Sequence, residues 1–194
     1  MPSIDLIKKI RELTGAGMVD VQNALAESND DEDKAIEILR KKGQKIAIKR
    51  GGRTTSEGII DSYVHANGKI ASLVAVSCET DFVARNEEFR AFVHEVALQI
   101  AATAPQYVSP EEVPADVIEK EKEIFRAQLK QDGKPEDKWE KIMEGKLAKY
   151  YSEVCLLKQP YVKDDSKTIE DLLTEQIGKI GENIKITKFV YFTL

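Results

Sequence analysis

The chain has few of the residues that usually mark an enzyme or a secreted protein. Its 194 residues include only two cysteines, two histidines and one tryptophan. Cys78 and Cys155 lack the C-x-x-C spacing of a metal or redox site, and both stand among apolar residues, so we expect two reduced core side chains. Neither a P-loop nor a G-x-G-x-x-G dinucleotide loop is present in the sequence.

Long apolar runs and a large charge excess are also missing. The first residues, MPSIDLIKKI, do not form the apolar stretch of a signal peptide, and no later stretch is long enough to cross a bilayer. The net charge is −5, which provides no overall basic field for binding nucleic acid. We therefore expect a cytoplasmic protein that neither enters a membrane nor binds nucleic acid directly.

A catalytic centre is difficult to build from what remains. His65 ends a predicted strand and His94 lies in a predicted helix, and neither stands in a cluster of metal-ligating residues. A nucleophile built from Cys78 and a histidine stays possible on sequence alone, but nothing in the pattern favours it. We expect a binding protein rather than an enzyme, without a metal ion or other cofactor.

One local basic stretch leaves a second function open. The sequence RKKGQKIAIKRGGR carries Arg40, Lys41, Lys42, Lys45, Lys49, Arg50 and Arg53. We interpret it as a solvated helix end followed by a Gly51-Gly52 linker. The alternative is an adaptor that binds RNA, the ribosome or an acidic protein surface, although no aromatic residues alternate with the basic ones for base stacking.

Apolar residues at helical spacing predict three short helices in the first 43 residues. Ser3 is a suitable N-cap, Ile7 and Ile10 belong to the first apolar stripe, and Gly43 is suited to the C-cap of the third helix. With the basic stretch, this gives a predicted N-terminal three-helix domain at residues 1–53.

From Gly58 onward the period of the apolar residues changes to two. Strands are predicted at 59–65 and 70–78, joined by an Asn67-Gly68 turn, with a last strand at 184–192. Helices are predicted at 86–103 and 167–180, and an antiparallel helical hairpin at about 115–154. The fold class is therefore α+β, with a core domain at 54–194 in which a small antiparallel sheet packs with helices and the hairpin projects as an insertion.

The junction between the second strand and the next helix carries an acid beside a large aromatic residue, in the sequence CETDFVARNEEF. In one interpretation Asp81 caps the helix and Phe82 packs inward. In the other, Phe82 is a preorganised wedge that enters another protein, and Asp81 meets a hydrogen-bond donor there.

Two segments resemble the signatures of the translation elongation factor Ts family. They are IRELTGAGMVD at residues 10–20 and ETDFVARN at residues 79–86. Further similar segments are GKP at 133–135, CLLKQP at 155–160, KDDSKT at 163–168 and KIGENI at 179–184. The first segment alone would fit any ubiquitin-associated-like three-helix bundle, but the order and spacing of the set are specific.

The resemblance implies a guanine-nucleotide exchange factor for elongation factor Tu. Such a factor binds the GDP-loaded partner and promotes release of magnesium and GDP, so that GTP enters. It implies that the N-terminal domain docks on the GTP-binding domain of the partner and that a second segment acts beside the magnesium site. The residues in the N-terminal domain are Arg11, Met18 and Val19, and those in the second segment are Thr80, Asp81, Phe82 and Val83.

The sequence departs from the family pattern at two places. Val19 replaces a common second methionine, and Gln22-Asn23 replaces a usual pair of lysines. The chain also has a single set of strands where longer members carry a duplicated half. A homodimer is expected, because a lone three-stranded sheet leaves edges and a face to cover.

Overall fold

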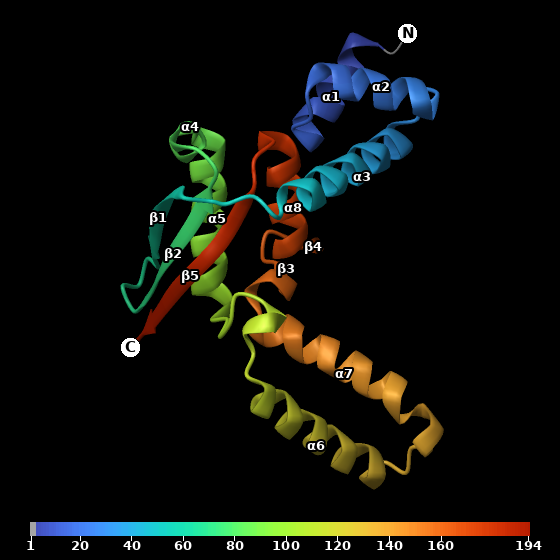
Figure 1. Cartoon of the computed structure of the whole chain (residues 1–194), viewed down its shortest axis with the longest axis vertical. Helices are drawn as coiled ribbons and strands as arrows, with labels where there is room; N and C mark the ends of the chain where they lie inside the picture. The colour runs from blue at the N-terminus through green and yellow to red at the C-terminus, as the bar shows by residue number, and fades with distance from the viewer. Residues whose placement is uncertain (1–2) are drawn as a thin grey trace. The chain divides into compact units, whose positions relative to one another are not determined.

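The structure, a computed structural model, describes residues 3–194 and confirms the α+β class (Figure 1). The chain forms two compact units. The first contains the residues up to Asp61, Val74–Glu95 and Asp171–Thr187, and the second contains Ser62–Leu73, Val96–Glu170 and Lys188–Leu194. The predicted domain boundary between residues 53 and 54 stays a prediction.

The N-terminal part is a bundle of α1 (Ile4–Thr14), α2 (Met18–Ser28) and α3 (Glu32–Arg50). Ser3 caps α1 as predicted, because its hydroxyl accepts a hydrogen bond from the Leu6 N–H at 3.1 Å. Gly15 ends α1 with a φ of 65°, a conformation that glycine adopts without strain. The core of the bundle consists of the buried side chains Ile7, Ile10, Val21, Ala24, Leu25, Ala35 and Leu39.

The prediction that α3 ends at Gly43 is wrong. The helix continues through the basic stretch to Arg50, so most of that stretch is helix and not a tether. Gly43 instead allows α8 (Ile169–Ile180) to approach closely, since a Cβ atom built on Gly178 would lie 2.8 Å from the Gly43 Cα atom. The two glycines therefore mark a place where the backbones of two helices nearly touch.

Gly178→Ala is expected to lower the free energy of unfolding by about 1–2 kcal/mol, because the overpacking cost exceeds the gain in helix propensity. Gly145→Ala in α7 (Trp139–Val154) is the matched control. It has open space around its Cβ position and is expected to raise stability by up to about 1 kcal/mol. Urea unfolding measures both changes, and equal effects of the two substitutions would contradict the close crossing.

The sheet has the strand order β1-β2-β5, with β1 (Glu57–Val64), β2 (Ile70–Cys78) and β5 (Ile184–Thr193). Side-chain bonds from Ser77 to the Lys185 carbonyl and from Thr187 to the Ala75 carbonyl show that β5 runs antiparallel to β2, because one index rises as the other falls. The last strand therefore joins the hairpin, as predicted.

The hairpin turn differs in detail from the prediction. The Gly68 N–H donates to the His65 carbonyl at 2.8 Å, and Gly68 has a φ of 65°. Asn67 is not among the residues with positive φ. Instead, its side-chain oxygen accepts a bond from the Lys69 N–H at 2.9 Å. Only one residue of the Asn-Gly pair therefore needs the left-handed conformation.

A one-turn helix, α4 (Asp81–Ala84), follows β2 and leads into α5 (Glu87–Thr103). The Asn86 side chain accepts a bond from the Glu88 N–H at 2.7 Å and so begins α5. The apolar face of α5 is buried, with Phe89, Phe92, Val93, Val96 and Ile100 all in the core. The helix lies against β2, where the Ser72 hydroxyl donates to the Ala97 carbonyl at 2.6 Å.

The predicted helical hairpin is present as α6 (Ala115–Gln131) and α7, with the turn at Gly133. The two helices meet where the Lys146 ammonium donates to Gln128 at 2.7 Å and lies 5.4 Å from the centre of the Phe125 ring. Short 3-10 turns precede, join and follow them at η1 (Pro110–Glu112), η2 (Glu136–Lys138) and η3 (Leu156–Lys158).

The structure also contains a second, two-stranded sheet, which the apolar pattern of the sequence does not predict. It consists of β3 (Pro160–Tyr161) and β4 (Asp164–Thr168), which run antiparallel. Because β4 occupies residues up to Thr168, α8 begins at Ile169 and not at the predicted Lys167. Gly181, with a φ of 80°, follows the end of α8 at Ile180, where the helix was predicted to end.

Candidate functional site

The corner between β2 and α5 presents Phe82 to solvent. The Phe82 side chain is 80% exposed, although large aromatic side chains are usually buried in a folded chain. Thr80, not Asp81, is the N-cap of α4, because its hydroxyl accepts a bond from the Val83 N–H at 3.4 Å. The interpretation in which Asp81 caps the helix and Phe82 packs inward is therefore wrong.

The neighbours of Phe82 on the corner are partly exposed. The Asp81 carboxylate forms an ion pair with Arg85 at 3.1 Å, and both side chains reach solvent. Val83 is half-buried and Ala84 is buried beneath the turn. The four predicted residues Thr80–Val83 therefore lie together on one turn, with an acid and an aromatic ring at its outer surface.

Two carboxylates hold this corner from beneath. The Glu182 carboxylate accepts bonds from the Thr80 N–H at 3.1 Å and from the Thr80 hydroxyl at 2.8 Å. In the opposite direction, the Glu79 carboxylate accepts a bond from the Asn183 N–H at 2.7 Å. Residues 79–80 and 182–183 thus exchange carboxylate-to-backbone bonds, and we call this arrangement the clasp.

Glu79 also connects the clasp to the end of α3. Its second carboxylate oxygen pairs with Arg53 at 3.1 Å and with Arg50 at 3.5 Å. The bond from the Asn183 N–H lowers the pKa of Glu79 below its ordinary value, and Arg53 and Arg50 lower this pKa further. Glu79 is therefore ionised at neutral pH, where all these bonds are available.

We expect the stabilising effect of Glu79 to depend on pH. A lowered folded-state pKa contributes stability above the ordinary pKa of 4.5, and this contribution is lost as the pH falls through the folded value. The difference in Tm between the wild type and Glu79→Gln should therefore be largest at neutral pH and should disappear at acidic pH. Glu57→Gln, at an exposed glutamate of β1, is the control. A Tm difference that is the same at all pH values would contradict the role of the ionised clasp.

The basic stretch is largely engaged within the chain. Arg50 and Arg53 pair with Glu79, Lys42 pairs with Asp20 of α2, and Lys41 pairs with Glu37 on the same helix. These ion pairs reduce the positive charge available to a phosphate backbone. In the part of the chain that the structure describes, these pairs argue against the alternative of an RNA-binding adaptor.

The three candidate residues in the bundle lie on its surface, around the α1–α2 connection. Arg11 is exposed near the end of α1, and Met18 and Val19 are 54% and 66% exposed at the start of α2. Met18 therefore does not belong to the core of the bundle. Leu13 is also exposed there and was missed, because its helical spacing from Ile10 resembles that of a core residue.

Both cysteines are fully buried and free. Burial raises the pKa of Cys78 to about 11, and it does the same for Cys155. A thiol that stays protonated at neutral pH is a poor nucleophile. This geometry argues against the interpretation in which Cys78 attacks a substrate.

No group of three or more His, Cys, Asp or Glu side chains in residues 3–194 is placed to hold a metal ion. Across the same residues, the structure contains no helix with the length and apolar character needed to cross a membrane.

Together, the fold and the corner define a small α+β protein that displays an aromatic residue on a braced turn, as protein-binding modules do. The family model for elongation factor Ts matches residues 4–194. The chain therefore belongs to the elongation factor Ts family, whose members are translation elongation factors.

Several curated proteins named elongation factor Ts are similar to the chain over nearly its whole length. The one from Caldanaerobacter subterraneus subsp. tengcongensis is 54% identical over 192 residues, which is 99% of this chain and 96% of the relative. The one from Thermotoga maritima is 55% identical with the same coverage of both chains. The one from Fervidobacterium nodosum is 56% identical over 188 residues, which is 97% of this chain and 95% of the relative.

Proposed function

We propose that this protein is the guanine-nucleotide exchange factor for elongation factor Tu. It binds the GDP-loaded partner and promotes release of magnesium and GDP, so that GTP enters and translation elongation continues in the cytoplasm. Membership of the elongation factor Ts family supports the proposal at the level of translation elongation. The observation that carries the mode of action is Phe82, exposed on a capped turn.

Exchange of this kind requires binding energy and no covalent chemistry. The factor must bind the nucleotide-free partner more tightly than the GDP-loaded one. By linkage, the factor weakens GDP binding to the same extent that GDP weakens binding of the factor. Weakening GDP by ~10⁴-fold requires about 5.5 kcal/mol of coupling. Burying Phe82 fully contributes about 1.5–3 kcal/mol, so other contacts must supply the rest.

In the proposal the remaining contacts come from the corner and the bundle. Asp81 faces a donor beside the magnesium site of the partner, because a buried carboxylate needs one. Thr80 and Val83 complete that contact. The exposed residues Arg11, Met18 and Val19 dock on the GTP-binding domain, since arginine and methionine are enriched in interfaces.

The test is the release of fluorescent GDP from elongation factor Tu in the presence of magnesium. Addition of this protein is expected to accelerate release strongly. Addition of the same protein unfolded by heat is the control for nonspecific effects. Release at the unassisted rate in the presence of folded protein would overturn the proposal.

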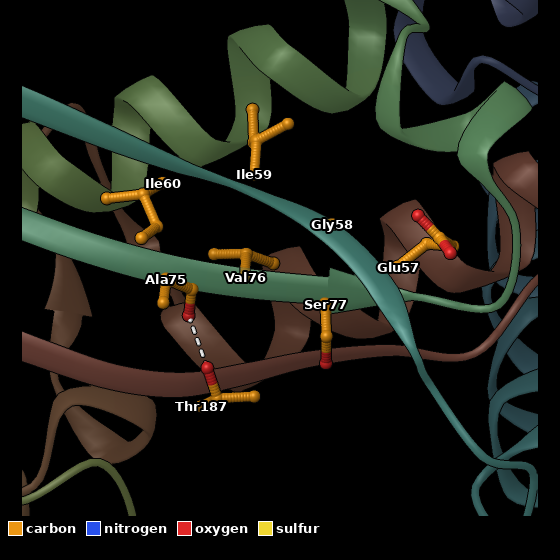
Figure 2. A pocket seen from close by; sticks show the side chains of 8 residues that line it. All are labelled: Glu57, Gly58, Ile59, Ile60, Ala75, Val76, Ser77 and Thr187. Atoms are coloured by element: carbon orange, nitrogen blue, oxygen red, sulfur yellow. Dashed lines mark hydrogen bonds between the residues drawn. The ribbon is translucent and has the colours of Figure 1, made fainter.

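A homodimer also belongs to the proposal, through the outer face of the sheet. Figure 2 shows the side chains of β1, β2 and β5 that line a hollow at this sheet. Ile60 stands beside the hollow with 73% of its side chain exposed. An uncovered apolar sheet face is a common basis for self-association. Sedimentation equilibrium should give a dimer that Ile60→Lys weakens, and a monomer at all concentrations would contradict it.

A further inference from the structure

The strongest unassigned feature of the chain is the clasp beneath the corner. Glu182 and Asn183 are not among the candidate contact residues. Both lie in KIGENI, one of the segments that resemble the family. The structure brings this segment, from the turn between α8 and β5, against the residues that begin the exposed turn.

We infer that Glu182 is a positioning residue for nucleotide exchange, one that fixes the Thr80 cap and so holds Phe82 and Asp81 in the orientation that enters the partner. The inference rests on the proposed function, since the exchange assay measures its consequence. Glu182 acts through Thr80 and is not proposed to contact the nucleotide or the magnesium ion.

The geometry limits what else could order this turn. α4 contains only four residues, and an isolated helix of one turn has no stability of its own in water. Its hydrogen bonds within the chain include the Ala84 N–H to the Thr80 carbonyl at 3.2 Å and the Arg85 N–H to the Asp81 carbonyl at 3.2 Å. The acceptors of the two bonds are the carbonyls of Thr80 and Asp81, whose orientation depends on the Thr80 cap.

Glu182 satisfies both donors of Thr80 at the same time. One carboxylate oxygen accepts from the N–H and the other accepts from the hydroxyl. Once the hydroxyl proton is committed to Glu182, the hydroxyl lone pairs face the Val83 N–H, which the cap must accept. The carboxylate thus sets the direction of the hydroxyl as well as the position of the backbone.

The rest of the clasp keeps Glu182 in place. Asn183 is 2% exposed, and its side-chain amide donates to the Arg53 carbonyl at 2.8 Å. Its N–H donates to Glu79, which Arg50 and Arg53 hold from the other side. Because the residue after Glu182 is fixed in this way, the Glu182 carboxylate is preorganised and loses little freedom when it binds Thr80.

The consequence for exchange follows from population arithmetic. GDP release depends on the turn being in the orientation that enters the partner. If the turn has this orientation for only a fraction of the time, the rate of release is multiplied by that fraction. Docking of the bundle through Arg11, Met18 and Val19 does not depend on the turn. Loss of the clasp should therefore lower the maximal exchange rate and leave the half-saturating concentration nearly unchanged.

The experiment compares the wild type, Glu182→Ala and Glu182→Gln in two measurements. In the first, with the added protein at a saturating concentration, Glu182→Ala should give a rate of GDP release from elongation factor Tu about 10-fold lower than the wild type gives. This is the change expected when a hydrogen bond to a charged group is lost. Glu182→Gln keeps the length and one acceptor oxygen and should give an intermediate rate. Glu140→Ala removes the same charge from an exposed site on α7 and should match the wild type.

Hydrogen–deuterium exchange of the free protein separates positioning from direct contact with the partner. In Glu182→Ala, peptides that cover residues 79–86 should exchange faster, while peptides from α6 and α7 stay unchanged. A slower release of GDP without faster hydrogen exchange at the corner would overturn the inference, since Glu182 would then act on the partner itself.

Failure of the inference is distinguishable from failure of the proposed function. If the wild type accelerates GDP release and Glu182→Ala does so equally well, the proposed function stands and the positioning role is wrong. If the wild type itself has no effect, the proposed function is wrong. In that case, hydrogen–deuterium exchange still tests whether Glu182 orders the corner. Unchanged hydrogen exchange at residues 79–86 in Glu182→Ala would show that it does not.

Discussion

Phe82→Ala is expected to reduce the maximal rate of GDP release by about 10- to 150-fold, because burial of this ring supplies about 1.5–3 kcal/mol of differential binding. The stability of the free protein should change little. The ring is 80% exposed, and substitutions at exposed positions usually change the free energy of unfolding by about 0.5 kcal/mol or less.

The measurement is stopped-flow release of fluorescent GDP, with Tm recorded for each variant. Phe192→Ala is the matched control, since Phe192 is another exposed phenylalanine and lies near the end of β5. The control should keep the wild-type rate. Equal rates for the wild type and Phe82→Ala would contradict the wedge, and a large fall in Tm would show that Phe82 belongs to the core after all.

Gly58→Ala is expected to have the largest effect on stability, a loss of at least about 3 kcal/mol, because steric overlap and backbone strain add. A Cβ atom at this position would lie 2.2 Å from the Val76 carbonyl oxygen and 2.7 Å from the Ser77 Cα atom. Gly58 also has a φ of 150°, which residues with a side chain rarely adopt. Figure 2 shows Gly58 on β1 beside the neighbouring strand β2.

Urea unfolding, followed by circular dichroism, measures the loss. Gly52→Ala, six positions earlier, is the control, because its Cβ position is open and its backbone needs no unusual φ. The control should stay within about 0.5 kcal/mol of the wild type. A fully stable Gly58→Ala would contradict the close approach of the two strands.

Much of the fold could be predicted from the sequence, since apolar periodicity depends on local geometry. The stripe on α5 corresponds to the face that the structure buries. In β5 the alternation holds only at the start of the strand, where Ile184 and Ile186 are buried, because Val190 and Phe192 are exposed. Gly43 shows the limit of this reasoning. A glycine near a possible helix end resembles a C-cap, whereas its real environment is Gly178, which is distant in sequence. The short strands β3 and β4 have too few residues for any period to emerge.

The candidate site was predictable only in part, and for a physical reason. Motif resemblance supplied Thr80–Val83 by residue number, but spacing alone could not say whether Phe82 faces the core or solvent. The clasp lay beyond sequence reasoning because Thr80 and Glu182 are separated by 102 positions, and no local pattern relates them. The only indication in the sequence was that the segments at 79–86 and 179–184, which contain Thr80 and Glu182, both resemble the family.

The most direct test of the central claim is the affinity of this protein for elongation factor Tu in two states, nucleotide-free and loaded with GDP and magnesium. An exchange factor must discriminate between them, because a ligand with equal affinity for both states shifts no equilibrium. We predict that Kd is lower for the nucleotide-free partner by a factor on the order of 10⁴. Equal Kd values for the two states would contradict the account, whatever the effects of substitutions at the corner.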